Sequence, residues 1–354
     1  MTKVLVVSTS KKTRGGITAV LKLYEQSPMW KRYHCRWIGT HRDGSNLRKV
    51  WYMVKGMIAY TLLIPFYDIV HFHVSLPTTI KRKYPLFLLA KLLGKKTLIH
   101  LHCGSQIDDI WNDKYQYMFE RCDCVIALSE NLKKKVEERL STQGFKGSKI
   151  QDFFQELRVV YNPCPIITNK TQYEKKNYIL FSGTVYEGKG YKDLIRAFAK
   201  VAADHSEWKI VLAGNGEVEQ ARILAEELGI SEQVDLLGWV NGEAKHKAFS
   251  EAKALCLPSY AEGFPMAVLD AWAYGLPVVT TPVGGVPDVA IDGENMLLFN
   301  SGDIDTLAMK LSQVMNNEEL RKKLSAESLK MAEGKFNLNT ITEQVAEIYE
   351  ELSY

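Results

Sequence analysis

Two carboxylates and a short glycine-containing turn stand together in residues 258–277. Glu262 precedes a Gly-Phe pair, Pro265 suits the first position of a helix, and Asp270 follows about two helical turns later. Backbone amides at a helix start, aided by the helix dipole, bind phosphate groups. Carboxylates about 12 Å apart would accept hydrogen bonds from hydroxyl groups at opposite ends of one ligand. The alternative is an ordinary loop acid at Glu262 and an exposed helix residue at Asp270.

A second turn has the composition of an anion-binding loop. It reads SGTVYEGKG at residues 182–190 and follows an expected strand. Glycines let backbone amides approach a ligand closely, and the ammonium group of Lys189 can neutralise phosphate oxygens. Turns of this composition are also common without any ligand, so a solvated turn stays open as the alternative.

Histidines end two of the expected strands. His100 and His102 lie on the same side of one strand because side chains alternate, so one of the pair is expected to be internal. His71 and His73 end the preceding strand in the same way. A packed, hydrogen-bonded histidine is the alternative to ligand binding at His102. We do not expect the four histidines to bind a metal.

The elements that must position these residues alternate regularly along the chain. Short apolar runs alternate with helical patterns, which predicts βα units and parallel sheets. Ligands bind beyond the carboxyl ends of strands in open α/β sheets, where both turns lie. We expect strands at residues 3–8, 34–39, 68–73, 96–102, 123–128 and 157–161, and then at 177–182, 208–213, 233–237, 253–257, 277–281 and 295–299.

The twelve expected strands divide into two domains of six. The sequence NPCP at residues 162–165 contains two prolines, which break a helix and stiffen the chain. We therefore expect a domain at 1–165 and a second at 166–338. A last helix at about 339–354 has apolar residues at helical spacing. It could complete the second domain or return to the first, and the sequence alone favours the second domain.

The charge of the chain is unevenly distributed. Residues 1–165 contain 27 Lys and Arg against 13 Asp and Glu, whereas the remainder contains 18 against 28. A basic first half favours anionic partners. Because no nucleic-acid-binding module is recognisable, we expect an anionic membrane surface or a lipid diphosphate and no nucleic acid.

Residues 47–66 are almost entirely apolar, with basic residues near their start. The charge-free run is too short to span a bilayer. It predicts either a helix packed against the sheet or a helix lying partly in a membrane interface.

Six cysteines show no CxxC pair, and no charged segment followed by a secretory apolar stretch opens the chain. These features predict reduced thiols in a cytoplasmic protein, with peripheral association at the inner membrane face as an option.

Taken together, the motifs resemble the retaining GT-B glycosyltransferases of glycosyltransferase family 4, group 1. The stretch 262–270 is similar to the E-x7-E motif of that family, and so are GLPVV at 275–279, GGVPD at 284–288 and LAGNG at 212–216. The resemblance covers most of the second half and, more loosely, the first. It implies two facing Rossmann-like domains with parallel sheets and a cleft between them, with the last helix packed back on the first domain.

The resemblance also implies roles for individual residues. Glu262 would contact the donor sugar, Asp270 the ribose and Lys189 the diphosphate, while His102 would lie beside the transferred sugar. The implied catalytic residues are His102, Glu262 and Lys189. The implied donor-binding residues are Arg14, Gly15, Gly16, Gly183, Thr184, Lys189, Asn215, Gly263, Phe264, Pro265, Met266 and Asp270.

Two positions depart from the family pattern. The family usually has glutamate at the position of Asp270, and often an arginine at the position of Thr184. Arg14 is a candidate to replace that missing cation.

The activity that the resemblance implies is transfer of a hexose from a nucleoside-diphosphate sugar to a glycan or lipid-diphosphate-linked saccharide. Transfer would proceed with retention of configuration and without a metal or other cofactor. A sugar-nucleotide epimerase or phosphorylase of GT-B fold is an alternative, as is a catalytically silent nucleotide-binding relative.

Overall fold

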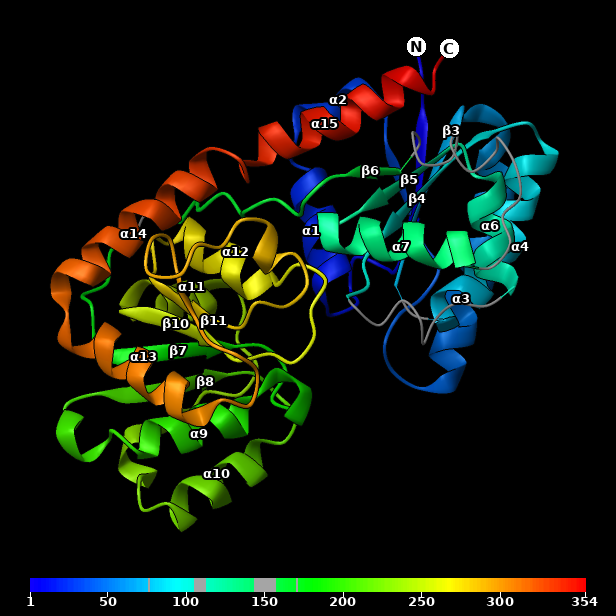
Figure 1. Cartoon of the computed structure of the whole chain (residues 1–354). Coiled ribbons are helices and arrows are strands. Elements are labelled where there is room, and N and C mark those ends of the chain that lie inside the picture. The colour runs from blue at the N-terminus through cyan, green and yellow to red at the C-terminus, as the bar shows by residue number, and fades with distance from the viewer. Residues whose placement is uncertain (76, 105–112, 143–156, 170) are drawn as a thin grey trace. The chain divides into compact units, whose positions relative to one another are not determined.

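The chain forms two compact α/β units in the computed structural model, which describes residues 1–75, 77–104, 113–142, 157–169 and 171–354 (Figure 1). The N-terminal unit comprises Met1–Pro163 and Leu338–Tyr354, and the C-terminal unit comprises Cys164–Asn337. The chain therefore passes between the units inside the NPCP segment, next to the expected boundary.

The N-terminal unit contains a six-stranded parallel sheet in the order β2-β1-β3-β4-β5-β6. Its central strands β1 and β3 are buried along their whole length, as is usual for a parallel sheet with helices on both faces. All six strands expected in this half are confirmed. Their bounds are β1 Val4–Ser8, β2 Arg36–Gly39, β3 Ile69–Val74, β4 Lys96–Leu101, β5 Cys124–Ala127 and β6 Leu157–Val159.

Helices connect these strands and pack among themselves. Helix α4 packs against α3 and α6, and α15 packs against α1 and α2. The helices are α1 Gly16–Tyr24, α2 Pro28–Arg32, α3 Asn46–Leu63, the 3-10 helix η1 Ile64–Phe66, α4 Pro77–Leu92, α6 Asp113–Arg121, α7 Glu130–Thr142 and α15 Leu338–Glu351.

Helix α15 belongs to the N-terminal unit, so the expectation from sequence alone was wrong and the resemblance was right. Arg32 forms an ion pair with Glu343 (Nη1 to Oε1, 2.8 Å), and the hydroxyl of Tyr33 donates a hydrogen bond to the Ala346 carbonyl. Tyr349 is buried against the sheet. Helical spacing of apolar residues predicts that a helix has a buried face, but not which surface buries it.

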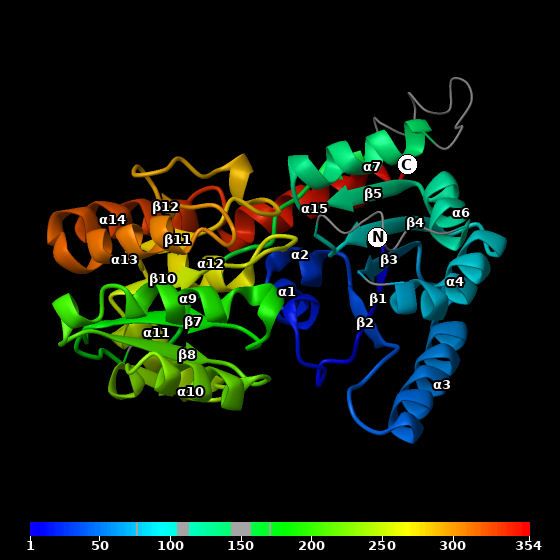
Figure 2. The ribbon, with the colours of Figure 1, turned by 60° about the horizontal axis from the view of Figure 1, so that its bottom comes forward.

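The C-terminal unit contains a second six-stranded parallel sheet, in the order β12-β11-β10-β7-β8-β9 (Figure 2). The six strands expected in this half are also confirmed. Their bounds are β7 Tyr178–Ser182, β8 Lys209–Ala213, β9 Val234–Leu236, β10 Ala254–Leu257, β11 Val278–Thr280 and β12 Leu297–Leu298.

Helix α9 packs against α10 and α13, and α12 packs against α14. The helices of this unit are α9 Tyr191–Ala199, α10 Val218–Glu227, α11 Gly242–Glu251, α12 Met266–Ala273, α13 Ile304–Asn316 and α14 Glu318–Glu333, with 3-10 helices η2 Glu187–Lys189, η3 Ala203–His205, η4 Ser231–Gln233 and η5 Val286–Asp288.

The strand order of the C-terminal unit reverses between β7 and β10. From β7 the chain builds outward through β8 and β9, and it then returns to build β10, β11 and β12 on the other side. At such a reversal the connections that follow the two strands lead to opposite faces of the sheet, and ligands of open α/β sheets bind beyond the carboxyl ends of the strands there. The turns concerned are those after β7 and β10, which are the two turns singled out by their composition.

The docking of α15 yields a stability prediction. Replacing Tyr349 by alanine should lower the free energy of unfolding of the N-terminal unit by roughly 3–5 kcal/mol, because a fully buried ring leaves a cavity. Urea unfolding measures the loss. The matched control is Tyr354→Ala, which removes an almost fully exposed ring on the same terminal segment and should change stability little. Equal effects of the two substitutions would contradict the docking.

Candidate functional site

The candidate donor site of the C-terminal unit is built around a lysine–glutamate pair. Lys189, at the end of η2, donates through its Nζ to Oε1 of Glu262, which follows β10. The Ser259 hydroxyl donates to the same oxygen at 2.8 Å. Two residues predicted separately therefore lie together. Oε1 of the Glu262 carboxylate therefore accepts hydrogen bonds from two donors.

The turns that carry this pair approach each other backbone to backbone. A Cβ atom at Gly190, whose φ is 70°, would lie 2.0 Å from the Pro258 carbonyl oxygen. A Cβ at Gly284, with φ 61°, would lie 2.3 Å from the carbonyl oxygen of Gly263. No side chain fits at such distances, and positive φ adds strain for any other residue. Glycine at both positions therefore fixes the spacing of the turns.

The turn after β7 is also tied to the turn after β8. The amide of Val185 donates to the carbonyl oxygen of Asn215 at 2.8 Å, and the amide of Gly183 donates to that of Ala213 at 3.1 Å. Thr184 between them is exposed. The structure thus brings Gly183, Thr184 and Asn215 to one edge of the sheet, as the motifs predict.

Helix α12 begins one residue later than expected. Pro265 is the N-cap and Met266 is the first helical residue. The amides of Met266 and Ala267 have no acceptor within the helix and can serve a ligand. Phe264 is buried, and its ring packs 5.1 Å from that of Phe336, between centroids. Only the backbone of Phe264 can therefore contribute to a donor site.

Asp270 is a buried carboxylate with a charged partner. Its side chain is 12% exposed, and Oδ2 accepts a hydrogen bond from Lys245 Nζ at 2.7 Å. Burial raises the pKa of Asp270, and Lys245 acts in the opposite direction. The alternative of an exposed helix residue was wrong. Sequence reasoning missed Lys245, which lies on α11 in no motif and pairs across 25 residues.

The remaining predicted donor residues lie in the N-terminal unit. Gly15 precedes α1 with φ 130° and ψ 169°, and Gly16 is the first residue of that helix. The amide of Arg14 donates to Oδ2 of Asp43 at 3.1 Å, which ties this turn to the segment after β2. A contribution of Arg14 to diphosphate binding stays a prediction.

Four histidines form a stack at the ends of β3 and β4. The rings of His100 and His102 are 4.4 Å apart between centroids, which confirms that they share one side of the strand. His73 Nδ1 lies 2.8 Å from His102 Nε2, and His71 Nδ1 lies 2.6 Å from the Tyr349 hydroxyl. His102 keeps partial exposure, whereas the other three rings are fully buried. His71 and His73 are therefore internal residues.

Burial keeps these histidines neutral. It lowers the pKa of His100 to about 3, and burial followed by the neighbouring histidines lowers those of His71, His73 and His102 well below the ordinary value. Among the described residues, neither ring nitrogen of His100 has a hydrogen-bond partner. Burial also lowers the pKa of Lys83, which donates to the His73 carbonyl, to about 7.

Ligand atoms of His71, His73 and His100 lie within 4.8 Å of one another, a spacing that a metal ion could use. The expectation that the chain needs no metal stays a prediction.

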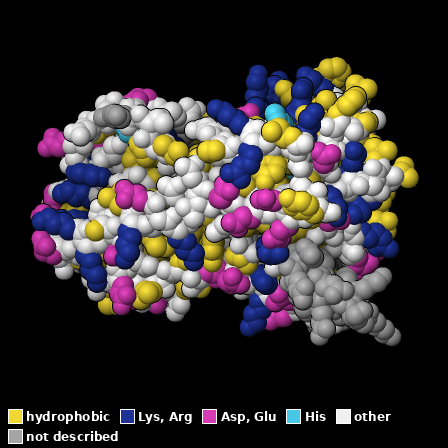
Figure 3. Space-filling model, turned by 90° about the horizontal axis from the view of Figure 1, so that it is seen from above, with side chains coloured by type: hydrophobic (Ala, Val, Ile, Leu, Met, Phe, Trp, Pro, Cys, Tyr) yellow, Lys and Arg dark blue, Asp and Glu magenta, His cyan; other side chains and the backbone are white. Residues whose placement is uncertain are grey.

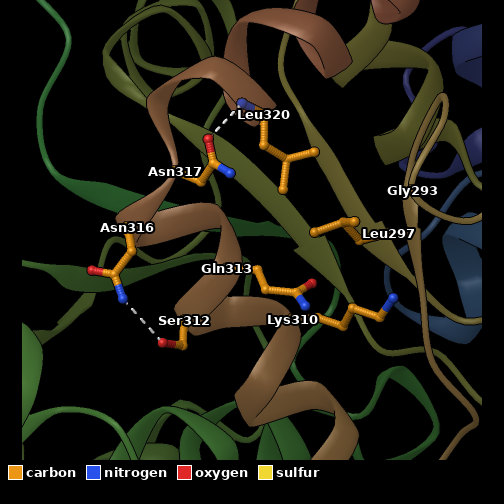
Figure 4. A pocket seen from close by; sticks show the side chains of 8 residues that line it. All are labelled: Gly293, Leu297, Lys310, Ser312, Gln313, Asn316, Asn317 and Leu320. Carbon is orange, nitrogen blue, oxygen red and sulfur yellow. Dashed lines mark hydrogen bonds between the residues drawn. The ribbon is translucent and has the colours of Figure 1, made fainter.

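A separate hollow lies between α13 and α14 (Figure 4). Side chains of both helices line it, together with Gly293 and Leu297. The Leu320 amide donates to Asn317 Oδ1 at its rim, at 2.9 Å, which is the cap of α14. None of the predicted site residues lines this hollow.

Comparison with known proteins shows which protein family the C-terminal unit matches. Residues 166–331 match the family described as Glycosyl transferases group 1. The C-terminal unit is a group 1 glycosyltransferase domain. Both ion pairs, Lys189–Glu262 and Lys245–Asp270, lie inside this group 1 domain.

Similarity to individual proteins extends beyond the group 1 domain. The chain is 28% identical over 267 residues to an uncharacterized glycosyltransferase of Methanocaldococcus jannaschii, which covers 70% of this chain and 65% of that protein. It is 28% identical over 246 residues to a GalNAc-alpha-(1->4)-GalNAc-alpha-(1->3)-diNAcBac-PP-undecaprenol alpha-1,4-N-acetyl-D-galactosaminyltransferase of Campylobacter jejuni, covering 67% of this chain and 64% of that protein. The chain thus spans less than two thirds of the length of either relative.

The fold is similar to that of HepE from Anabaena, solved in complex with UDP-glucose. The TM-score is 0.73 at 15% identity, covering 99% of this chain and 100% of that one. The two six-stranded parallel sheets form the GT-B fold.

The Asp270 pair yields a binding prediction. If Asp270 contacts the ribose as the resemblance implies, Asp270→Asn should weaken binding of nucleoside diphosphates by about tenfold or more, because a charge-assisted hydrogen bond to a ribose hydroxyl would be lost. Isothermal titration calorimetry with UDP and GDP measures the change. The control is Asp305→Asn, which breaks an exposed Asp–Lys pair with Lys200 and should leave binding unchanged. Unchanged affinity in Asp270→Asn would assign the pair a purely structural role.

The buried histidines predict a pH dependence of stability. Their pKa values are lower in the folded than in the unfolded chain, so the unfolded chain takes up more protons below about pH 6.5. The N-terminal unit should therefore lose stability on acidification, by about 2 kcal/mol between pH 7 and pH 5 from His100 alone. Thermal unfolding of His100→Gln should show a weaker loss than the unchanged chain. His34→Gln, at an exposed position, should keep the original profile, and identical profiles for both variants would refute the explanation.

Proposed function

We propose that the chain transfers a hexose from a nucleoside-diphosphate sugar to a glycan or lipid-linked saccharide, with retention of anomeric configuration and without a metal. The observation that carries the proposal is the placement of two lysine–carboxylate pairs on either side of the start of α12. Lys189 and Glu262 precede the helix start, and Asp270 with Lys245 lies one turn beyond it. This arrangement suits a diphosphate with a hydroxylated ring at each end.

In the proposed reaction the bond between sugar C1 and the diphosphate oxygen breaks, and the acceptor oxygen bonds to C1 on the same face. The acceptor proton passes to the departing diphosphate. Positive charge develops on the sugar and negative charge on the leaving group, so cations and amide donors aimed at the diphosphate lower the barrier. Lys189 and the first amides of α12 would supply them.

We assign Glu262 a positioning role. Its carboxylate, held by Lys189 and Ser259, would accept hydrogen bonds from sugar hydroxyls and orient C1 toward the acceptor. His102, in the N-terminal unit, would act as the resemblance implies, as a neutral ring that donates or accepts a hydrogen bond.

The names of two related proteins support the proposed classes of donor and acceptor. The matched C. jejuni enzyme carries an undecaprenol-diphosphate-linked saccharide in its name, and the solved Anabaena protein binds UDP-glucose. We extend both classes to this chain as part of the proposal, with polysaccharide or glycoconjugate assembly as the setting.

The proposal predicts a separation of binding from transfer. Glu262→Gln should reduce transfer by about a hundredfold while retaining affinity for nucleoside diphosphates, because the lost contact is to the sugar. Lys189→Ala should weaken that affinity by about tenfold or more. A thermal-shift panel of nucleotides and nucleotide sugars identifies the donor, and mass spectrometry of glycan and lipid-linked acceptors then detects the product.

The matched control is Glu187→Gln, an exposed carboxylate in the same turn as Lys189, which should leave both readouts unchanged. A donor that binds without transfer to any acceptor would indicate a silent relative. Conversion of the nucleotide sugar without an acceptor would indicate an epimerase.

A further inference from the structure

Helix α3 is apolar on both of its faces. Its inner face is fixed against the sheet at Gly56, where a Cβ atom would lie 2.7 Å from the Gly39 carbonyl oxygen. The hydroxyl of Tyr60, fully buried, donates to the Leu86 carbonyl oxygen of α4 at 2.8 Å. These contacts hold the helix in one rotation about its axis, so its outer face is a defined surface.

The outer face of α3 carries a continuous hydrophobic stripe. At 100° per residue the exposed apolar side chains fall within an arc of about 140°, and the 18-residue helix extends about 27 Å. A soluble helix normally places polar residues there. The stripe consists of Leu47, Val50, Trp51, Val54, Met57, Ile58 and Leu62, with Leu47 and Leu62 85% and 67% exposed.

Helix α4 extends the stripe. Lys95 donates through Nζ to the Pro65 carbonyl oxygen at 3.2 Å, which joins the end of α4 to the end of α3. Phe66, Leu92 and Leu93 are exposed around this junction. Contiguous apolar surface of this extent marks an interaction site.

The charges around the stripe specify the partner. Helix α3 itself contains three basic residues, Arg48, Lys49 and Lys55, and no acidic residue. Arg48 and Lys55 lie seven residues apart on the same flank of the stripe. Figure 3 shows hydrophobic and basic side chains gathered together at the upper right, on the N-terminal unit, with few acidic ones among them.

We propose that α3 lies flat on an anionic lipid bilayer, with its stripe among the acyl chains and its basic flank at the head groups. No helix among the described residues is long and apolar enough to cross a bilayer, so the stripe would lie in the interface. A second copy of the chain packed on the stripe would bring the basic flanks of the two copies together, and this repulsion disfavours a dimer at this surface. The inference deepens the proposed function, because lipid-linked acceptors are presented at such a surface.

Vesicle flotation tests the proposal with the full chain. The protein should float with vesicles of equal parts phosphatidylcholine and phosphatidylglycerol, and much less with phosphatidylcholine alone. Ile58→Gln with Leu62→Gln should weaken binding by at least about tenfold. The matched control, Ile223→Gln with Ile291→Gln, changes exposed isoleucines of the C-terminal unit and should leave binding unchanged.

The second part of the test removes positive charge from the flank of the stripe. Arg48→Gln with Lys55→Gln should reduce binding to the anionic vesicles by about fivefold for each charge, with a smaller effect at high salt. UDP binding should be unaffected in every variant, which separates this proposal from the donor site. Failure to float with either vesicle would overturn the inference, and so would a dimer, seen by analytical ultracentrifugation, that the Ile58→Gln/Leu62→Gln variant dissociates.

Discussion

The contact of Gly190 with the carbonyl of Pro258 is the constraint on which the candidate donor site depends. It fixes the turn after β7 against the turn after β10, where the strand order reverses. Because the two backbones touch, side chains next to the contact come within hydrogen-bonding distance, and Lys189 meets Glu262. A larger residue at position 190 would separate the turns and, with them, the two charges. The chemistry of the site is in this sense set by the absence of a side chain.

Two largely buried carboxylates of the group 1 domain, Glu262 and Asp270, are each balanced by a lysine. Charges removed from water are costly unless they are paired and hydrogen-bonded, and Glu262 and Asp270 are both paired. A nucleoside-diphosphate sugar arriving at this site would offer Lys189 a new anionic partner, while Glu262 would exchange an ammonium donor for hydroxyl donors. The pairs therefore hold the carboxylates in position without a ligand, which would reduce the cost of ordering them on binding.

Much of the fold could be predicted because local sequence patterns indicate the strands and the boundary between the units. The twelve strands follow from apolar runs bounded by turn residues, and the unit boundary from the prolines of NPCP. The partner of α15 could not be predicted, because helical periodicity defines a buried face without naming the surface that covers it. Lys245 was missed for a related reason, since its pairing with Asp270 depends on the distance between two helices and on no sequence motif. The start of α12 differed by one residue because proline is compatible with both the cap and the first turn.

Because α15 belongs to the N-terminal unit, the unit that is synthesised first is completed last. Residues 164–337 are inserted, in topological terms, between the first 163 residues and the segment that finishes their unit. His71 meets Tyr349 across 278 positions, so the unit that leaves the ribosome first keeps an uncovered hydrophobic surface until α15 has been synthesised. The group 1 domain, by contrast, has all of its own residues available earlier. Assembly would then be sequential, with the inserted unit maturing before the one that began first.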